Sequence, residues 1–246
     1  MSRILMPLPD TDFDVTETSV PWRLLTRDGH DVVFATEHGG QAPAGDALLL
    51  DGSLGKLGPA AEPRAFYDEM ARSPEFRAPI AWSAIEPEQY DGLILAGGHA
   101  PGMKQYLGST ALQEKVGAFW RTGRPVGAIC HGVIVLARTI DPATGKSVLH
   151  ETRTTCLPKY MERGAWLLTR WTRGRYYRTY DVYVEDEVKA ALGDAKTQFL
   201  RGPLTFSKRG SDGQDDGTFV VEDGRYVSAR WPGDAYLFAR RFAARL

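Results

Sequence analysis

Cysteine is scarce in this sequence of 246 residues, and no apolar run is long. The two cysteines are Cys130 and Cys156. Without a recognisable secretory leader they favour a reducing compartment, and a Cys130–Cys156 bridge is the less favoured alternative. No stretch approaches the roughly 20 apolar residues that a membrane helix needs. Pro7 breaks the first apolar run, which is more typical of a strand than of a leader. We therefore expect a cytoplasmic protein with no membrane partner.

Excess charge is also missing. The formal net charge of −1 gives no long-range attraction to nucleic acid or anionic lipid. Arginines within residues 163–178 do alternate with tryptophan and tyrosine, a mixture that can bind single-stranded nucleic acid. Acidic residues follow them directly, at 181 and 185–187. A salt-bridged segment or a subunit interface is the better interpretation, and we expect no nucleic-acid partner.

Signatures of bound groups are absent as well. The sequence has no Gly-rich phosphate-binding loop ending in Lys-Ser or Lys-Thr. Its five histidines are scattered, without the paired spacing of metal ligands on one element. We therefore expect neither a metal nor an organic cofactor.

Short apolar runs alternate with helical patterns through the first 140 residues. Runs that are apolar almost throughout are typical of parallel strands buried on both faces. The alternation predicts an α/β fold, with helices on both sides of a mainly parallel sheet. The predicted strands are residues 4–8, 31–36, 90–97 and 124–130, with helices from about 15, 111 and 132.

Two predicted helices begin with the spacing of a capping box. Asp14 and Glu17 mark the first, and Thr110 and Gln113 mark the second. Pro21 falls in or near the first turn of the first helix, where its missing N–H is tolerated.

Two segments interrupt the alternation. Residues 40–88 are rich in Gly, Pro and Ala, with one helical piece near 66–70, and residues 159–195 form a more helical segment. We interpret both as insertions into a single domain spanning residues 1–246, the first lying over the strand ends. The chain then ends in a β-hairpin and a helix.

The hairpin pattern covers residues 218–230, with its turn at 222–224. Asp234 follows as the predicted N-cap of the last helix, in which Phe238 and Phe242 are spaced by four residues.

Cys130 stands where the fourth strand meets the next helix. This is the setting of a nucleophile elbow, whose sharp turn needs small residues two positions before and after the nucleophile. Ala128 and Gly132 meet that need. A thiol at a helix N-terminus faces the positive end of the helix dipole, which favours the thiolate. We therefore predict a reactive nucleophile at Cys130 rather than a buried structural thiol.

Neighbours of the elbow are candidates to assist the thiol. His131, adjacent in sequence and able to titrate near neutral pH, is the candidate general base, with a solvent-facing histidine as the alternative. Gly98 follows the third strand. If that strand lies beside the strand of Cys130, the N–H groups of Gly98 and His131 form an oxyanion hole; a plain turn is the alternative. We interpret His99 as a loop residue whose side chain is bonded to backbone.

These residues carry a family resemblance. Residues 93–99 (LILAGGH) and 126–132 (VGAICHG) together resemble the paired signature of the ThiJ/PfpI superfamily, which is related in fold to class I glutamine amidotransferases. Residues 17–21 are similar to the family's helix start bearing a glutamate, and residues 226–235 to its C-terminal segment. The resemblance implies a flavodoxin-like three-layer α/β/α sandwich, a reactive cysteine and a homodimer. The parts without resemblance are residues 40–88 and about 163–215.

The resemblance also implies further site residues. Glu17 would lie beside Cys130 and donate a hydrogen bond in its protonated form, because the like charge raises its pKa. A capping role for Glu17 is compatible with this one. Related enzymes with Cys-His at the elbow orient the histidine with an acidic residue after the next strand. Glu162 is the first carboxylate in that segment here, at a wider spacing than in the family. We interpret the preceding Cys156 as a structural thiol.

Three functions follow from this reading. The resemblance suggests a glutathione-independent glyoxalase, in which Cys130 adds to methylglyoxal as a hemithioacetal and lactate is released. The first alternative is an amidase or peptidase acting through an acyl-enzyme. The second is a protein without catalytic activity, either a sensor of thiol oxidation or a holdase chaperone.

Overall fold

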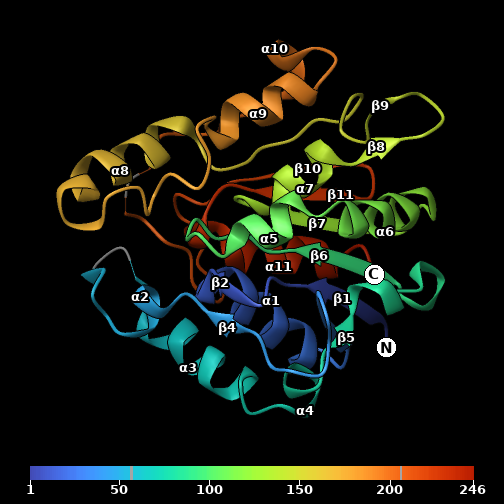
Figure 1. The fold of residues 1–246 in the computed structure, drawn as a ribbon, viewed down its shortest axis with the longest axis horizontal. Coiled ribbons are helices and arrows are strands. Elements are labelled where there is room, and N and C mark those ends of the chain that lie inside the picture. Colours follow the sequence, from blue (N-terminus) through green and yellow to red (C-terminus); the bar gives the residue numbers. More distant parts are fainter. Residues whose placement is uncertain (56–57, 206) are drawn as a thin grey trace.

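A mainly parallel sheet forms the centre of the computed structural model (Figure 1). The structure describes residues 1–55, 58–205 and 207–246. Within these ranges the sheet has seven strands in the order β10-β11-β7-β6-β1-β3-β5, and only β10 and β11 pair antiparallel. Its strands are β1 (Arg3–Pro7), β3 (Asp31–Thr36), β5 (Ile80–Ala81), β6 (Gly92–Leu95), β7 (Val126–Ile129), β10 (Val220–Asp223) and β11 (Tyr226–Ala229). Two small pairs lie outside it, β2 (Thr11–Phe13) with β4 (Ala44–Gly45) and β8 (Ile140–Asp141) with β9 (Lys146–Ser147).

Helices cover both faces of the sheet. The connection from β1 to β3 runs one way along the sheet and that from β6 to β7 runs the other way, so right-handed crossovers place their helices on opposite faces. None of the helices in the described ranges combines the length and apolarity needed to cross a membrane. The helices are α1 (Val15–Arg27), α2 (Ala47–Leu50), α3 (Ala61–Met70), α4 (Pro74–Arg77), α5 (Met103–Gly108), α6 (Thr110–Arg121), α7 (Gly132–Arg138), α8 (Lys159–Arg173), α9 (Val184–Ala191), α10 (Ala195–Gln198) and α11 (Ala235–Ala243).

This arrangement confirms the predicted three-layer α/β/α sandwich. Helices α1 and α11 pack together, with α11 against β7 and β11, whereas α5 and α6 flank α7, which packs against β6 and β7. Every residue of β6 and β7 is buried, as expected for parallel strands covered on both faces. The direction of winding reverses between β1 and β6. Ligand sites in such sheets lie at this reversal, beyond the carboxyl ends of the strands.

Some predicted boundaries were wrong by a residue or a turn. Ser109 rather than Thr110 caps α6, because the Ser109 hydroxyl accepts the N–H of Leu112 at 3.1 Å. Pro21 lies inside α1, beyond its first turn. The hairpin of β10 and β11 is confirmed, but its register pairs Asp223 with Tyr226, so the turn is one residue later than predicted.

The segment 40–88 is more regular than predicted. It supplies β5, which extends the sheet by pairing with β3, and α3, which packs along α1. A two-residue strand has no periodicity from which it could be recognised. The segment 159–195 is helical as predicted and holds α8 and α9, which Figure 1 shows on the opposite side of the view from α3 and α4.

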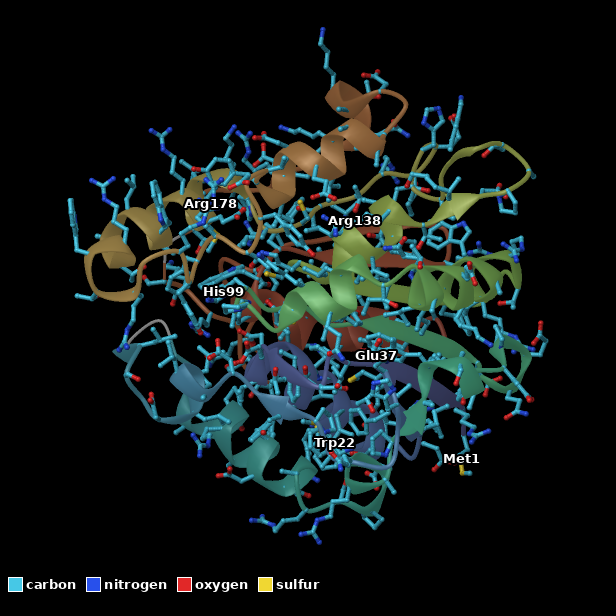
Figure 2. The ribbon with its side chains drawn as sticks, in the orientation of Figure 1. Met1, Trp22, Glu37, His99, Arg138 and Arg178 are labelled. Atoms are coloured by element: carbon cyan, nitrogen blue, oxygen red, sulfur yellow. The ribbon has the colours of Figure 1, made fainter. Side chains whose placement is uncertain are left out.

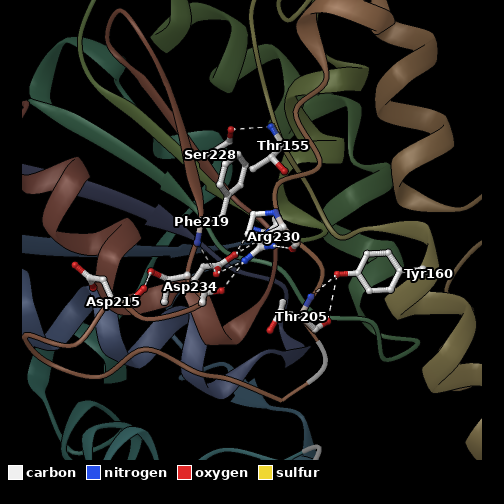
Figure 3. A network of polar contacts seen from close by, with 11 residues as sticks. Thr155, Tyr160, Thr205, Asp215, Phe219, Ser228, Arg230 and Asp234 are labelled. Atoms are coloured by element: carbon white, nitrogen blue, oxygen red, sulfur yellow. Dashed lines mark hydrogen bonds and ion pairs between the residues drawn. The ribbon is translucent and has the colours of Figure 1, made fainter.

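A buried ion pair replaces the predicted cap of α11 (Figure 3). Asp234 forms no cap bond; its carboxylate is bound by Arg230, with Nε–Oδ2 at 2.8 Å and Nη2–Oδ1 at 2.9 Å. Both side chains are fully buried. Arg230 also donates to the carbonyl of Pro203 at 2.8 Å, and Asp234 accepts the N–H of Phe219 at 3.0 Å. This network holds the segment before β10 against the end of β11.

We expect Arg230→Met to lower the free energy of unfolding by about 3–5 kcal/mol, because it leaves the Asp234 carboxylate buried without its partner. Urea unfolding followed by circular dichroism measures the loss. The double variant Arg230→Met/Asp234→Leu should recover much of it, since it removes both charges. A single variant as stable as the wild type would show that the pair is not required.

Candidate active site

Cys130 occupies a sharp turn between β7 and α7. Its φ of 58° lies in the left-handed region, which is uncommon outside glycine and marks strain at functional turns. The Cys130 N–H donates to the carbonyl of Ala229 at 3.0 Å, which anchors the turn to β11. A Cβ on Gly132 would lie 2.2 Å from the carbonyl oxygen of Leu95, so only glycine allows the turn to approach β6. These are the features of a nucleophile elbow.

Glu17 and Cys130 both lie against Gly97, which belongs to the loop that follows β6. A Cβ on Gly97 would lie 2.6 Å from Glu17 Oε2, 2.9 Å from Cys130 Cβ and 2.7 Å from the nitrogen of His131. Glu17 is fully buried, and its Oε2 accepts the Gly97 N–H at 3.0 Å. One of the two bonds of the predicted capping box, from the Asp14 N–H to the Glu17 side chain, is not formed. The Asp14 N–H donates instead to the Gly97 carbonyl at 2.8 Å. Asp14 still caps α1 by accepting from Glu17 and Thr16.

Burial changes the protonation of both groups. Burial and the nearby charge of Asp14 raise the pKa of Glu17 well above its usual range. Burial, followed by the charges of Glu17 and Asp14, raises the pKa of the Cys130 thiol, and the N–H of His131 only partly opposes this. The sequence predicted a thiolate from the helix dipole alone. The dipole is worth about one pKa unit or less, whereas full burial shifts a pKa by up to about 3–5 units. Cys130 is therefore a thiol when Glu17 is ionised, and protonation of Glu17 eases thiolate formation.

His131 lies against the thiol. Its Nδ1 is 3.5 Å from Cys130 Sγ, within hydrogen-bonding distance for sulfur, and its side chain is buried. Burial, with a smaller effect of His99, lowers the pKa of His131 to about 3. The imidazole is therefore neutral near pH 7 and has a lone pair that can accept the thiol proton.

Glu162 does not orient His131 in this structure. Burial raises the pKa of Glu162 to about 7, and its Oε2 accepts the N–H of Val184 at 3.0 Å. No hydrogen bond joins Glu162 to His131 among the described residues. Glu162 lies on α8 and faces the same cavity as Cys130. The interpretation of Glu162 as the third member of a triad therefore has no hydrogen bond to support it.

The two glycines after β6 have different neighbours. Gly97 is the one that packs against Cys130 and His131, whereas a Cβ on Gly98 would meet Met103 Sδ at 2.9 Å and the carbonyl oxygen of Asp12 at 2.8 Å. The backbone N–H of His131 forms a hydrogen bond that lowers the pKa of Cys130. The oxyanion hole from the N–H groups of His131 and Gly98 stays a prediction.

These groups form the floor of a cavity of about 240 Å³. Helix α8 covers it, and Trp231 and Pro232 close one side. Tyr160 of α8 exchanges hydrogen bonds with Thr205, donating to its carbonyl at 3.2 Å and accepting its N–H at 3.1 Å, so α8 is tied to the segment before β10 (Figure 3). The lining residues are Asp14, Glu17, His99, Cys130, Leu157, Tyr160, Met161, Glu162, Gly164, Ala165, Leu168, Tyr177, Arg209, Trp231 and Pro232.

Comparison with known proteins identifies the family. A family model described as ThiJ/PfpI family-like matches residues 8–203. The chain belongs to the ThiJ/PfpI family. An uncharacterized protein of Schizosaccharomyces pombe is 26% identical over 243 residues, which cover 97% of this chain and 81% of that protein. A probable glutathione-independent glyoxalase of the same yeast is 27% identical over 61% of this chain and 51% of its own length.

The relatives include other named activities and solved folds. A deglycase of Thermococcus kodakarensis is 25% identical over 66% of each chain. The crystal structure of glyoxalase III from Candida albicans superimposes with a TM-score of 0.73 at 20% identity, covering 100% of this chain and 97% of that one. At this identity the likeness shows the fold, which confirms the flavodoxin-like sandwich.

His99 of this ThiJ/PfpI protein, labelled in Figure 2, is not the backbone-bonded loop residue that the sequence suggested. Its Nε2 is buried and has no hydrogen-bond partner among the described residues, and its side chain lines the cavity. The ring stacks on Tyr177 with centroids 4.2 Å apart, and burial lowers its pKa to about 3. The sequence did hold one signal for this role. His99 lies in the loop after β6, and β6 is the neighbour of the strand that ends at Cys130.

Arg209 was missed by sequence reasoning because it belongs to no motif. It lines the cavity, and burial lowers its pKa while its charge acts on Asp14 and Glu17. Its guanidinium carbon lies 5.2 Å from the centre of the Trp231 ring. The cavity thus combines three buried acids, Asp14, Glu17 and Glu162, with the partly buried guanidinium of Arg209.

Neither cysteine is in a disulfide, as predicted. Both are free and buried, and burial raises the pKa of Cys156. Cys156 does not line the cavity. Across the described residues, no group of three or more His, Cys, Asp or Glu side chains is arranged to hold a metal ion.

The pKa of Glu17 predicts a pH-dependent stability difference. A carboxyl group with a raised folded-state pKa stabilises fully below its unfolded value, here 4.5, and loses that contribution as pH rises toward the folded pKa. Wild type should therefore lose about 1.4 kcal/mol per pH unit above pH 4.5 relative to Glu17→Gln. Urea unfolding of both proteins at several pH values measures the slope. A difference that is constant with pH would mean that Glu17 is ionised in the folded protein.

Proposed function

We propose that this protein is a cysteine-dependent enzyme that converts small α-oxoaldehydes to 2-hydroxy acids without glutathione. The observation that carries the proposal is the Cys130 thiol, held on a strained turn at the floor of a cavity with neutral His131 Nδ1 at 3.5 Å. The relatives named glyoxalase support the choice of reaction.

The first step is addition of the thiol to the aldehyde. The Cys130 S–H bond breaks as a C–S bond forms, and His131 accepts the proton and returns it to the aldehyde oxygen. The N–H of His131 stabilises the negative charge that develops there. Because Glu17 is protonated, no second negative charge lies beside the sulfur. The product is a hemithioacetal, with no change in oxidation state.

The second stage is an internal redox step. A proton leaves the former aldehyde carbon and one is added to the adjacent carbon, so the first carbon is oxidised to a thioester and the second is reduced to an alcohol. Water then cleaves the thioester, which releases the 2-hydroxy acid and restores the thiol. No external oxidant or reductant is required.

The alternatives have less support from the site. Amide hydrolysis depends on a well-oriented base, and among the described residues Glu162 forms no bond to His131. Sensing of oxidation depends on an exposed thiolate, whereas Cys130 is buried and its pKa is raised.

The test is conversion of methylglyoxal by purified protein without glutathione. We expect lactate to appear in the same amount as methylglyoxal disappears. In D₂O the lactate should carry deuterium at C2 if the proton exchanges with solvent. Loss of methylglyoxal without lactate would reduce the protein to a scavenger and contradict the proposal. Release of ammonia from amide substrates under the same conditions would favour the hydrolase.

A further inference from the structure

Helix α8 forms an apolar roof over the reactive thiol. Six of its residues line the cavity, including the polar Tyr160 and Glu162. The other four, Met161, Gly164, Ala165 and Leu168, have the spacing i, i+3, i+4, i+7, which places them on one face. Glu162 is the only buried residue of this helix. The apolar face of α8 borders the cavity, with Met161 and Ala165 also packed against the core and Leu168 largely exposed.

The cavity has two chemically distinct ends. Segments that follow strand ends supply the reactive and polar side chains, such as Glu17, His99 and Cys130. Helix α8 and the corner after β11 supply most of the apolar ones, including Leu157 before the helix and Trp231, although α8 also contributes Tyr160 and Glu162. A ligand with a polar reactive head and an apolar substituent matches this division.

The cavity is also larger than a three-carbon aldehyde requires. An apolar protein cavity of about 150 Å³ is sufficient to bind benzene, and the volume here is about 240 Å³. Methylglyoxal has fewer heavy atoms than benzene and would leave much of the space under α8 unfilled. Burial of further apolar surface would strengthen binding of a bulkier substrate.

Gly164 keeps that space open. A Cβ built on Gly164 meets no atom within 4 Å, and its neighbour Ala165 carries only a methyl group. Glycine inside a helix is destabilising relative to alanine. Both small residues line the cavity, so we expect larger side chains at these positions to narrow it.

We propose that the preferred substrates are α-oxoaldehydes with an aryl or branched apolar substituent, which lies beneath Gly164 and Ala165 while the aldehyde carbon meets Cys130. This inference rests on the proposed function and names its substrate class. For phenylglyoxal the chemistry is unchanged: Cys130 Sγ bonds to the aldehyde carbon, its proton passes to the oxygen, and after the internal redox step water releases mandelate.

Substrate preference tests the roof directly. We expect kcat/KM for phenylglyoxal to exceed that for methylglyoxal by about tenfold or more, measured as mandelate and lactate formed. Gly164→Leu should lower the value for phenylglyoxal by about tenfold more than the value for methylglyoxal. Thr172→Leu is the matched control: Thr172 is exposed on the same helix and does not line the cavity, so neither value should change by more than about twofold. Equal values for the two aldehydes in wild type, or an equal loss of both in Gly164→Leu, would overturn the inference.

A second measurement does not depend on turnover. The rates at which N-phenyl iodoacetamide and iodoacetamide alkylate Cys130 are followed by intact mass and divided by their rates with free cysteine, with Cys130→Ser to subtract Cys156. We expect the phenyl reagent to be favoured in wild type and to lose about tenfold of that preference in Gly164→Leu. If this holds while neither aldehyde is turned over, the proposed function fails and the apolar ligand class stands. An unchanged preference, or no alkylation by the phenyl reagent, would overturn the inference.

Discussion

Cys130→Ser is expected to lower kcat/KM for methylglyoxal by about 10³-fold or more. A serine hydroxyl is much less acidic and less nucleophilic than a thiol, so the same imidazole of His131 would activate it far less well. The turn at Cys130 imposes its φ of 58° on either residue, so the substitution changes the chemistry more than the geometry. Lactate formation without glutathione is the measurement.

Cys156→Ser is the matched control for this loss. Cys156 is also fully buried and free, but it lies outside the cavity lining, so its variant should keep activity within about twofold once its folding is verified by circular dichroism. Turnover by Cys130→Ser within tenfold of wild type would remove Cys130 as the nucleophile.

The second large effect is expected for His131→Gln, at about 10²–10⁴-fold in kcat/KM. Glutamine keeps a polar side chain near the thiol but has no basic nitrogen, so the Cys130 proton has no acceptor 3.5 Å away. Because the loss is one of thiol activation, alkylation of Cys130 by iodoacetamide should slow in the same variant. A structural role alone would lower stability without slowing alkylation of the folded protein.

His150→Gln is the control for His131. His150 bonds to Lys146 at the surface and does not line the cavity, so its loss should leave both alkylation and turnover within about twofold. An unchanged alkylation rate in His131→Gln would instead direct attention to His99, the other neutral imidazole of the site.

Local sequence patterns predicted the main strands and helices well, because each of these elements depends on residues close to one another in sequence. The apolar run at residues 31–36 is β3 with the predicted bounds, and the capping role of Asp14 depends on backbone N–H groups within one turn. The elbow was recognisable because a strand, a nucleophile and small flanking residues occur in order. Two-residue β5 carries no such pattern, so the true extent of the sheet was not predictable.

The two capping predictions that were wrong, at Asp234 and Glu17, failed because another hydrogen-bond partner competes for each carboxylate. Asp234 has the position of a helix cap, but Arg230 offers its carboxylate two charged hydrogen bonds in a buried site. Glu17 has the spacing of a capping box, but its partner is the N–H of Gly97, in the loop after β6. In each case the observed hydrogen-bond partner is either distant in sequence or not part of the local capping pattern. Its strength comes from burial, which sequence spacing does not reveal.

The sequence by itself determined the order of elements, the elbow at Cys130 and the membership of the ThiJ/PfpI family. These depend on local periodicity, turn chemistry and motifs. Only the tertiary structure decided the protonation of Cys130, Glu17 and His131, because burial depends on everything packed around a group. It also decided that α8 roofs the cavity. Where a helix lies depends on how distant segments fill space together, and no pattern within α8 encodes that.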